Sequence, residues 1–539
     1  MIAVLAQKDD HPAVMEFFEL FKTPWEFYRA DGNYSVLICT TNTIPVNSAK
    51  VVFVYGSIEN SFDRAHGTKI RSRRSGSIVS NGSSRIPVYG GCLVFEASGP
   101  SVVTHVSTHE PAAVAADSAG QAIVRVGFDL FQEVRHLLTQ GQPADRAATP
   151  TLELHIALLR SLILGCSVSL IEIPPVPDGH SFIACLTHDM DHIGIRNHKL
   201  DHTILGFFYR ATVGSVVDVC RGKKNLRQMI INWVAALKLP LVHMGLAGDF
   251  WSQPDRYGEI EKEANSTFFV IPKKGEPGLD ARGNRQGRRA ASYDAAEHLD
   301  LLRKLQVAGN EIGLHGIDAW RDCTSGRQEQ EIICRLTGVA ETGVRMHWLF
   351  FNEESPSVLE AAGFSYDSTV GYNQTIGYRA GATQVFKPMN ATKLLELPMH
   401  VMDTALFYPN YLNLTPGQAQ EAIRPLIENA VRFGGALTVN WHDRSVAPER
   451  LWDSSYAQLL DELRSAGACF LTAGQAVSWF RKRRATTFER IGDTVKVKIP
   501  INDDPRIPGL RVRIYNPDAT GEKYSETTSA EGGEIRLAA

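Results

Sequence analysis

The stretch Phe182-Ile-Ala-Cys-Leu-Thr-His-Asp-Met-Asp-His192 joins a short apolar run to two carboxylates and two imidazoles. The apolar run has the length expected of a strand buried on both faces of a parallel sheet. In α/β sheets and barrels, ligands bind at the carboxyl ends of the strands, where Asp189, Asp191 and His192 would lie. Side chains two apart on an extended strand point the same way, so these carboxylates repel each other unless a cation lies between them. A divalent metal site and a solvated loop with spare acidic residues both fit this stretch.

The length and composition are those of a soluble globular protein. The 539 residues correspond to about three domains, and 44% hydrophobic and 21% charged residues are ordinary proportions. The net charge of −3 and the pI of about 6.6 indicate no nucleic acid partner. No apolar run reaches the length that a membrane span needs.

The eight cysteines occur singly, without a CxxC pair, and several lie inside apolar runs, as Cys39 and Cys185 do. Buried free thiols are typical of proteins in a reducing compartment. The first residues lack the basic segment and the long apolar core of a secretory signal. The sequence therefore predicts a cytoplasmic protein.

Residues 1–110 are predicted to form a small α/β domain of unknown role. Strand-like runs at 34–39, 50–55 and 92–96 are separated by turn residues. The basic run at 71–77 could contact an acidic ligand, but such runs are more often solvated loops, and we expect a loop there.

Residues 111–177 are predicted to be a helical connector. Apolar residues recur at spacings of three and four within 128–138 and 152–164. The prolines at 174, 175 and 177 end this pattern.

Residues 178–484 alternate between strand-like and helix-like segments, as βα units around a parallel sheet do. The predicted strands are Phe182–Leu186, Thr267–Ile271, Glu311–Leu314, Val344–Met346, Leu394–Leu397, Ala436–Trp441 and Ala468–Leu471. A long segment, 193–264, rich in apolar helix-like sequence, follows the first strand. Loops of that size at the carboxyl face usually build or cover a site.

Residues 485–539 are predicted to form a small β module. Apolar and polar residues alternate in 494–499 and 510–515, which indicates half-buried antiparallel strands. Some fifty residues bury little core alone, so we expect this module to pack on the preceding domain.

Other predicted strands of the 178–484 region also end in ionisable residues: His315, Arg345 with His347, and His442. A single histidine at an apolar edge is most often structural. Several such residues at one face would together supply metal ligands, a general base, a general acid and a cation, which metal-assisted hydrolysis requires.

The 178–484 segment resembles the polysaccharide deacetylase (NodB-homology, carbohydrate esterase 4-like) superfamily. Six short motifs in the order of that family carry the resemblance: Thr187-His-Asp-Met-Asp191, Ser266-Thr-Phe-Phe-Val270, Glu311-Ile-Gly-Leu-His-Gly316, Arg345, Glu396-Leu-Pro398 and Trp441-His442. The resemblance implies a distorted (β/α)7 barrel, to which the small N-terminal α/β domain and the C-terminal β module are added.

Two departures from the family pattern indicate a divergent branch. Met190 separates aspartates that are adjacent in the family, and Ala319 stands where the family has a second histidine. His347, His192 or His188 could replace that ligand. His347 is preferred because neighbouring strands converge at a barrel mouth, whereas His188 should alternate away from the aspartates.

The resemblance also implies roles for these residues. Asp191 and His315 would bind a divalent metal, zinc by preference, with His347 or His192 completing the site. Asp189 would act as general base and His442 as general acid. Arg345 would either hold Asp189 ionised or form an ordinary structural ion pair.

Four residues are candidates for binding substrate: Trp320, Trp348, Tyr378 and Arg379. Aromatic faces suit the C–H surfaces of sugars, and Arg suits carboxylates or phosphates. A glycine-stabilised loop around Tyr378 and buried packing of at least one tryptophan are the structural alternatives.

Three functions fit the sequence. The first is a metal-dependent hydrolase that removes an N-acetyl group from an amino sugar of a bacterial glycan or its precursor. The second is a hydrolase of another C–N bond, in a formyl or cyclic amide group. The third is a non-catalytic glycan-binding protein, since Ala319 could mark lost catalysis. All three imply a carbohydrate or amide ligand, and the residues do not determine the oligomeric state.

Overall fold

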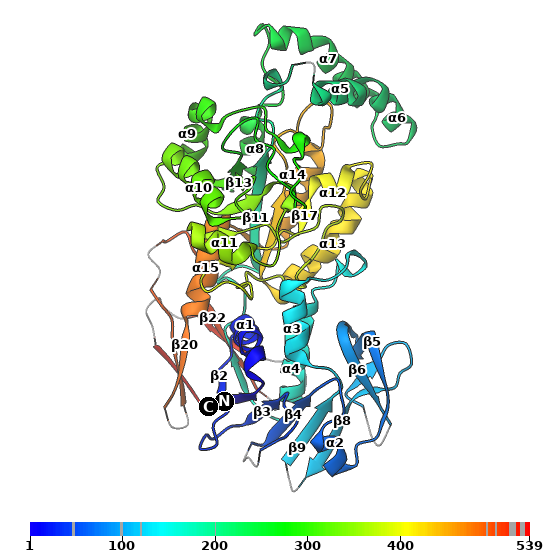
Figure 1. Ribbon diagram of the computed structural model, residues 1–539, viewed down its shortest axis with the longest axis vertical. Coiled ribbons are helices and arrows are strands. Elements are labelled where there is room, and N and C mark those ends of the chain that lie inside the picture. Colours follow the sequence, from blue (N-terminus) through cyan, green and yellow to red (C-terminus); the bar gives the residue numbers. More distant parts are fainter. Residues whose placement is uncertain are drawn as a thin grey trace.

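Two large sheets organise the chain, one within residues 2–126 and one within residues 182–470. The computed structural model describes residues 1–538 except 46–48, 97–100, 119–120, 200, 263, 492–493, 502–503, 517–523 and 529–533. The molecule is elongated: the first sheet lies at one end, the second in the middle, and the helices of residues 202–243 at the far end (Figure 1).

The N-terminal sheet has the strand order β2-β1-β3-β4-β9-β8-β7-β5-β6. Its parallel strands are β1 (Ile2–Leu5), β2 (Trp25–Phe27), β3 (Val36–Cys39), β4 (Val51–Tyr55) and β9 (Gln121–Val126). Its antiparallel strands are β5 (Ile70–Asn81), β6 (Ser84–Phe95), β7 (Val103–His105) and β8 (Pro111–Ser118).

Helices bury both faces of this sheet. Alternate residues of its strands accordingly belong to two different hydrophobic cores. One core is shared with α1 (His11–Phe21), α3 (Leu130–Thr139) and α4 (Thr151–Gly165). The other core includes Phe62 of α2 (Ser61–His66). The continuous apolar runs of β3 and β4 follow from this burial on both sides.

Two predictions for this region are wrong. Residues 111–118 and 121–126, predicted as part of a helical connector, form β8 and β9, and the helices of this predicted connector begin at α3. The basic run at 71–77, predicted as a loop, lies in β5, which pairs with β6 along a long hairpin. The side chains of this run do not indicate a strand, but pairing with β6 provides hydrogen-bond partners for its backbone. Arg71 and Arg74 form ion pairs with Glu110. The domain boundaries proposed from the sequence stay predictions.

The second sheet curls into an open (β/α) barrel with the order β16-β15-β14-β13-β12-β11-β18-β17, and β19 pairs with β11. All of these pairs are parallel. The strands are β11 (Phe182–Met190), β12 (Thr267–Val270), β13 (Glu311–Gly316), β14 (Val344–Met346), β15 (Tyr366–Asp367), β16 (Leu395–Glu396), β17 (Val401–Met402), β18 (Ala436–Asn440) and β19 (Ala468–Phe470). The predicted distorted barrel is confirmed.

Each of the seven strands predicted between 178 and 484 occurs at its place, and β15 and β17 are additional. These two strands have two residues each, too few for an apolar period to reveal them. The helices between the strands are α8 (Pro254–Glu261), α9 (Leu299–Val307), α10 (Cys323–Thr337), α11 (Ser355–Ala362), α12 (Asp403–Phe407), α13 (Pro416–Phe433), α14 (Asp453–Ser465) and α15 (Ala473–Ala485).

The long segment after β11 forms a helical excursion beyond the barrel (Figure 1). It contains α5 (His202–Tyr209), a π-helical turn (Arg210–Gly214), α6 (Ser215–Cys220) and α7 (Leu226–His243). Within the described residues, one helical stretch, His202–Cys220, is long and apolar enough to cross a membrane by length and composition, and 28% of its apolar window is buried.

The C-terminal residues form two small antiparallel sheets, as expected of a β module. One contains β20 (Thr487–Ile491), β21 (Thr494–Lys498) and β24 (Glu534–Ala538); the other joins β22 (Arg511–Tyr515) and β23 (Tyr524–Thr528) to β10 (Leu170–Glu172). Val497 and Val512 share a core with the barrel residues Ile183 and Trp479. The module therefore packs on the barrel.

Buried polar contacts join the N-terminal domain to the barrel. Arg484 of α15 forms two hydrogen bonds with the Glu16 carboxylate, at 2.8 and 2.7 Å. Glu153 of α4 accepts hydrogen bonds from the backbone N–H and the hydroxyl of Thr383, at 2.9 and 3.0 Å. Burial raises the pKa of Glu153 to about 7, although the hydrogen bonds from Thr383 oppose this effect.

We expect Glu153→Gln to flatten the pH dependence of stability. The folded state binds the Glu153 proton more tightly than the unfolded state, so this contribution is present at low pH and is lost as pH rises through about 7. Between about pH 5 and pH 7.5, the free energy of unfolding measured by urea denaturation should fall less in the variant than in the unmodified protein. The two falls should differ by an amount on the order of 1–3 kcal/mol. Glu331→Gln, at an exposed position of α10, is the control. Equal slopes in all three proteins would contradict the assignment.

Candidate metal centre

Three ligand atoms from separate strands meet at the carboxyl edge of the barrel: Asp191 Oδ1, His315 Nε2 and His347 Nδ1 lie within 4.8 Å of one another. The carboxylate oxygen is 3.4 Å from the His315 nitrogen and 3.3 Å from the His347 nitrogen. The two imidazole nitrogens are 2.9 Å apart. Both histidines are buried, and Asp191 is partly exposed.

Strand register explains this convergence. Asp191 directly follows β11, His315 lies near the end of β13, and His347 follows β14. His315 is aligned with Arg345 across the β13–β14 pair. The His315 Nδ1–H donates to the Arg345 carbonyl at 3.0 Å. Because a carbonyl oxygen only accepts, this contact fixes the tautomer and turns the Nε2 lone pair of His315 toward Asp191.

The three atoms fit a divalent cation. Asp191 Oδ1 is buried and has no hydrogen-bond partner within the described part of the chain. A single proton can join only two of the three facing atoms, whereas one cation can accept a lone pair from each. One carboxylate and two imidazoles are a common ligand set of catalytic zinc, which keeps a further position open. Burial opposes ionisation of Asp191, but His347 and His315 keep its pKa well below its ordinary value, so it is a carboxylate, as a ligand must be.

The other aspartate has a different environment. Asp189 Oδ1 accepts a hydrogen bond from Arg345 at 3.1 Å, and its Oδ2 accepts one from the Asn440 side chain at 2.8 Å. Burial raises its pKa, but the charges of His315 and Arg345 lower it more, so the net pKa lies below the ordinary value. Asp189 Oδ2 is 3.9 Å from His315 Nε2, next to the cluster. Asp189 is therefore an ionised carboxylate beside the three ligand atoms.

His442 also faces Asp191, with its Nε2 3.9 Å from Asp191 Oδ2. Its Nδ1–H donates to Asp403 Oδ1 at 2.6 Å, and its backbone N–H donates to Asp403 Oδ2 at 2.8 Å. Burial lowers the pKa of His442, but the Asp403 carboxylate outweighs that effect and raises it to about 10. A protonated imidazole thus faces the cluster.

The two alternative histidine ligands point elsewhere. His192 Nδ1 contacts His198 Nε2 at 3.0 Å, and its ring packs near Trp251. His188 is buried between the Trp441 carbonyl at 2.7 Å and Glu261 at 2.8 Å. Of the histidines weighed as the replacement ligand, the structure brings His347 alone to Asp191 and His315.

Two of the four predicted substrate residues are buried. Tyr378 is 1% exposed and its hydroxyl donates to the Leu426 carbonyl. Trp320 is 3% exposed and packs edge to face with Phe350. Neither can contact a substrate without rearrangement. Tyr378 and Trp320 belong to hydrophobic cores of the barrel, which agrees with the structural alternatives for these residues.

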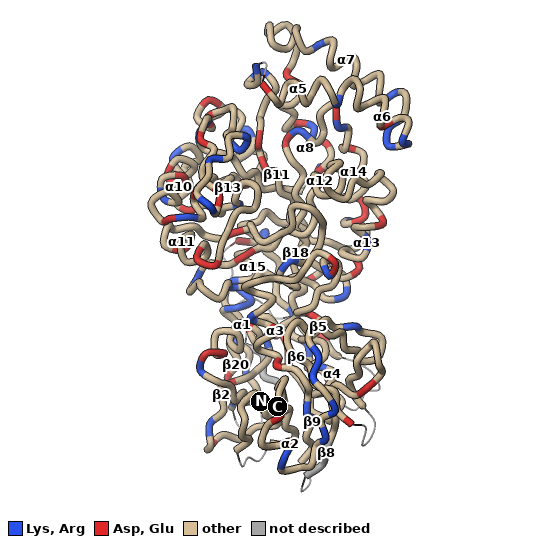
Figure 2. The backbone as a smooth tube through the Cα atoms, turned by 45° about the vertical axis from the view of Figure 1, so that its right-hand side comes forward, with Lys and Arg blue, Asp and Glu red and all other residues tan. Residues whose placement is uncertain are grey.

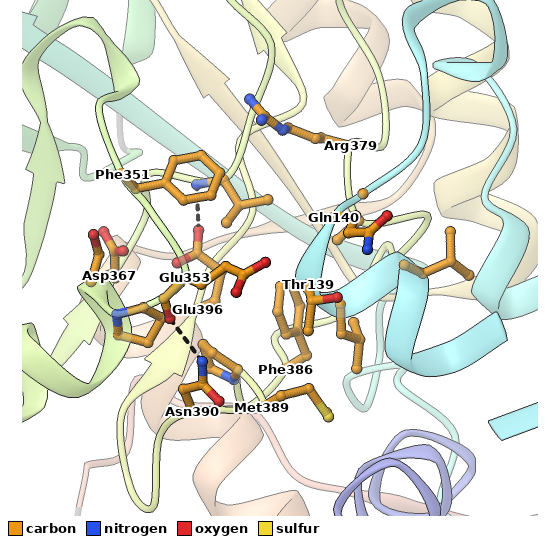
Figure 3. A pocket seen from close by; sticks show the side chains of 18 of the residues that line it. Thr139, Gln140, Phe351, Glu353, Asp367, Arg379, Phe386, Met389, Asn390 and Glu396 are labelled. Atoms are coloured by element: carbon orange, nitrogen blue, oxygen red, sulfur yellow. Dashed lines mark hydrogen bonds between the residues drawn. The ribbon is translucent and has the colours of Figure 1, made fainter. Parts of the chain in front are cut away.

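Arg379 lines a cavity of about 240 Å³ between α3 and the barrel (Figure 3). Its guanidinium lies over the Phe351 ring and donates to the Gly371 carbonyl. Asp367 and Glu396 lie in the same cavity, whereas none of the three metal-ligand candidates lines it. Arg379 therefore belongs to a different pocket from the cluster.

Trp348 is the one exposed member of the predicted substrate set, at 39%. Its ring centroid is 5.8 Å from that of His347. Trp348 and Leu349 both have positive φ, of 64° and 54°. Such conformations are uncommon for bulky residues and occur mainly at functional sites. Trp348 thus presents an apolar face beside the cluster.

Asp403 and Asn440 are functional residues that the sequence analysis missed. Asn440 lies directly before the Trp441-His442 motif, and its position at the end of a predicted strand could have indicated it. Asp403 follows the two-residue strand β17, which no periodicity reveals. It pairs with a residue 39 positions away, so only the tertiary structure identifies it.

No family model and no curated protein matches this chain. Solved structures of polysaccharide deacetylases do match. A Mycobacterium smegmatis protein provisionally assigned as one is 21% identical over 59% of this chain and 99% of its own, with a TM-score of 0.36. A probable polysaccharide deacetylase from Pseudomonas aeruginosa PAO1 is 14% identical over 57% of this chain and 94% of its own, with a TM-score of 0.34. A peptidoglycan N-acetylglucosamine deacetylase is 11% identical over 56% of this chain and 90% of its own, with a TM-score of 0.26.

These matches are to the family whose motifs the sequence resembles. Identities of 21% or less and TM-scores of 0.36 or less do not establish an activity.

We expect the purified protein to bind about one divalent metal ion per chain, and His347→Ala and Asp191→Ala each to lose most of it, because each removes one of three ligands. Elemental analysis after dialysis against zinc measures the stoichiometry. His192→Ala is the matched control, since His192 contacts His198 and not the cluster. Metal retained by His347→Ala and lost by His192→Ala would reverse the ligand assignment.

Proposed function

We propose that this protein is a metal-dependent hydrolase that removes an N-acetyl group from an amino sugar of a bacterial glycan or of a glycan precursor. The observation that carries the proposal is the meeting of Asp191, His315 and His347, with the Asp189 carboxylate 3.9 Å from His315 and the His442 imidazole 3.9 Å from Asp191. Metal-assisted hydrolysis of an amide uses this combination of groups.

A zinc or similar ion held by Asp191, His315 and His347 would supply Lewis acidity toward the amide carbonyl and the attacking water. His315 is held by a backbone carbonyl, as metal-binding histidines usually are.

Asp189 is suited to act as general base. It is ionised, it lies beside the cluster, and its contacts with Arg345 and Asn440 fix its orientation. It would take a proton from the water as the new C–O bond forms. Arg345 acts through Asp189, holding it ionised, and is therefore a positioning residue.

His442 is suited to act as general acid. Its Nδ1–H is held by Asp403, which leaves the Nε2–H facing Asp191 and the cluster. That proton would pass to the amine nitrogen as the C–N bond breaks, so that acetate and a free amine leave. The base and the acid thus both lie beside the ligand set.

Trp348 favours a sugar as the carrier of the amide. Its half-exposed indole lies next to His347, where it could stack on the C–H face of a sugar ring. A cytoplasmic location, which the scattered cysteines favour, would fit a glycan precursor better than a finished wall polymer.

Asp189→Asn is expected to lower kcat by roughly 10²–10⁴-fold while metal content stays unchanged, because the amide cannot accept the proton of water. Acetate release from N-acetylglucosamine oligomers measures the rate, and Asp300→Asn at an exposed position of α9 is the control. Full activity in Asp189→Asn would refute the base assignment. Release of formate from a formamido sugar in place of acetate would favour the second C–N hydrolase function.

Asp403→Asn is expected to lower kcat by roughly 10–10³-fold with little change in KM, since the imidazole of His442 loses the carboxylate that orients and charges it. Metal content should not change, because Asp403 contributes no ligand atom. An unaltered kcat would show that His442 does not transfer the proton.

A further inference from the structure

The helical excursion exposes an unusual amount of apolar surface. Residues 205–246 hold 14 of the 25 large hydrophobic side chains that are exposed in the described part of the chain. Leu237 is 79% exposed, Leu246 74%, Leu205 65% and Leu226 64%. Soluble proteins leave single apolar residues exposed, but a contiguous patch of this kind marks a contact with a partner or a membrane.

Helix α7 carries apolar residues on both of its faces. Ala235, Leu239 and Val242 pack in the excursion's own core, together with Phe207 and Trp251. The outward stripe repeats at spacings of four, four, three, four and three, which places its members along one side of the helix. Its members are Leu226, Ile230, Val234, Leu237, Leu241 and Met244, each 41–79% exposed.

The helix before it adds to the same kind of surface. Leu205, Tyr209, Val213 and Val216 are 41–65% exposed along α5, the π-helical turn and α6. Trp233, on α7, is 44% exposed and donates from its indole to Ser215, so the two helices are in direct contact. The two packed helices thus both carry exposed apolar side chains, among them the aromatic rings of Tyr209 and Trp233.

The charges of this segment are almost all positive. Between residues 199 and 246 there are seven lysines and arginines and two aspartates, in a chain whose net charge is −3. Asp201 caps α5, and Asp218 forms an ion pair with Lys224 at 3.3 Å. α7 contains Arg227 and Lys238 and no acidic residue. Figure 2 shows the excursion mostly tan with blue positions.

We propose that the surface formed by α5, α6 and α7 binds the face of a lipid bilayer that contains anionic lipids. An apolar helix face with Lys and Arg around it and aromatic residues on it is the pattern of interfacial helices. α5 and α7 each keep one side in the protein core, and α6 and α7 carry charged residues, so we expect the helices to lie on the membrane and not to cross it.

Charge disfavours a second copy of this chain as the occupant. A symmetric pair of α7 helices would place Arg227 and Lys238 of both copies in one interface. Neither helix has an acidic residue to pair with these four positive charges. An anionic lipid surface complements these charges.

The position of the surface relates it to the metal centre. The excursion leaves the barrel directly after β11, whose carboxyl end carries Asp191. The N-terminal domain lies at the opposite end of the molecule (Figure 1). Binding through α5–α7 would therefore hold the carboxyl edge of the barrel near the lipid headgroups. The binding itself does not depend on the proposed hydrolysis.

Flotation of the full chain with vesicles tests the proposal. The protein should float with vesicles of phosphatidylcholine and phosphatidylglycerol in about a three-to-one ratio and much less with phosphatidylcholine alone, and added salt should weaken the binding. No flotation with the anionic vesicles would overturn the proposal, and equal binding to both vesicle types would overturn its charge component.

Leu237→Asp should reduce the bound fraction by roughly tenfold, because it places a charge in the centre of the apolar stripe. Val307→Asp is the matched control: this side chain is 90% exposed on α9, outside the excursion. Circular dichroism and the thermal midpoint confirm that both variants fold. Binding of Leu237→Asp equal to that of the unmodified chain would refute the proposed surface.

Arg227→Glu with Lys238→Glu should remove the preference for anionic vesicles while leaving the apolar stripe intact. The oligomeric state of all proteins is measured by light scattering. A dimer that Leu237→Asp dissociates, in a protein that does not float with either vesicle, would show that a second copy covers this face.

Discussion

The arrangement of the barrel mouth depends on the hydrogen bonds and the ion pair of the buried Arg345 guanidinium. The guanidinium is fully buried, and it donates to the Thr187 hydroxyl at 2.7 Å and to Asp189 at 3.1 Å. It also donates to the carbonyl and hydroxyl of Ser368, and it lies over the Phe269 ring. A buried charge is tolerated only when it is paired and hydrogen-bonded. These contacts therefore require β11, β14 and the end of β15 to keep one relative position.

This constraint separates the roles of two aspartates that the sequence presents as equals. Asp189 lies inside β11 and is paired by Arg345 and Asn440. Asp191 lies just past the strand, where His315 and His347 face it. Asp189 is thus held ionised by Arg345, while Asp191 retains an oxygen that has no hydrogen bond within the described residues. In the proposed mechanism, Asp189 is therefore the general base and Asp191 is a metal ligand.

The additions to the barrel occupy different ends of it. The C-terminal module shares a core with Ile183 at the start of β11, and the N-terminal domain is joined through Glu16 and Arg484. The helical excursion extends from the other end of β11. The carboxyl edge with its metal centre thus faces away from the other modules and toward the surface proposed to bind lipid.

The sequence by itself determined the barrel and most of the polar residues at its mouth. Buried parallel strands read as continuous apolar runs, and their ends carry the ionisable residues, so the positions of Asp191, His315 and His442 could be predicted from local pattern. The preference for His347 over His188 followed from strand alternation. The strands at 111–118 and 121–126 could not be predicted, because the alanine-rich sequence at 112–116 favours a helix more than a strand.

Only the tertiary structure decided which groups pair. Asp403 contacts His442 across 39 residues and Asn440 contacts Asp189 across 251; such contacts arise from strand register and leave no trace in local spacing. Burial of Tyr378 and Trp320 likewise depends on neighbours distant in sequence. The exposed stripe of α7 has the apolar period of a core helix, and the pattern alone cannot say which side is covered. Hydrophobic periodicity specifies a face, whereas packing decides what that face meets.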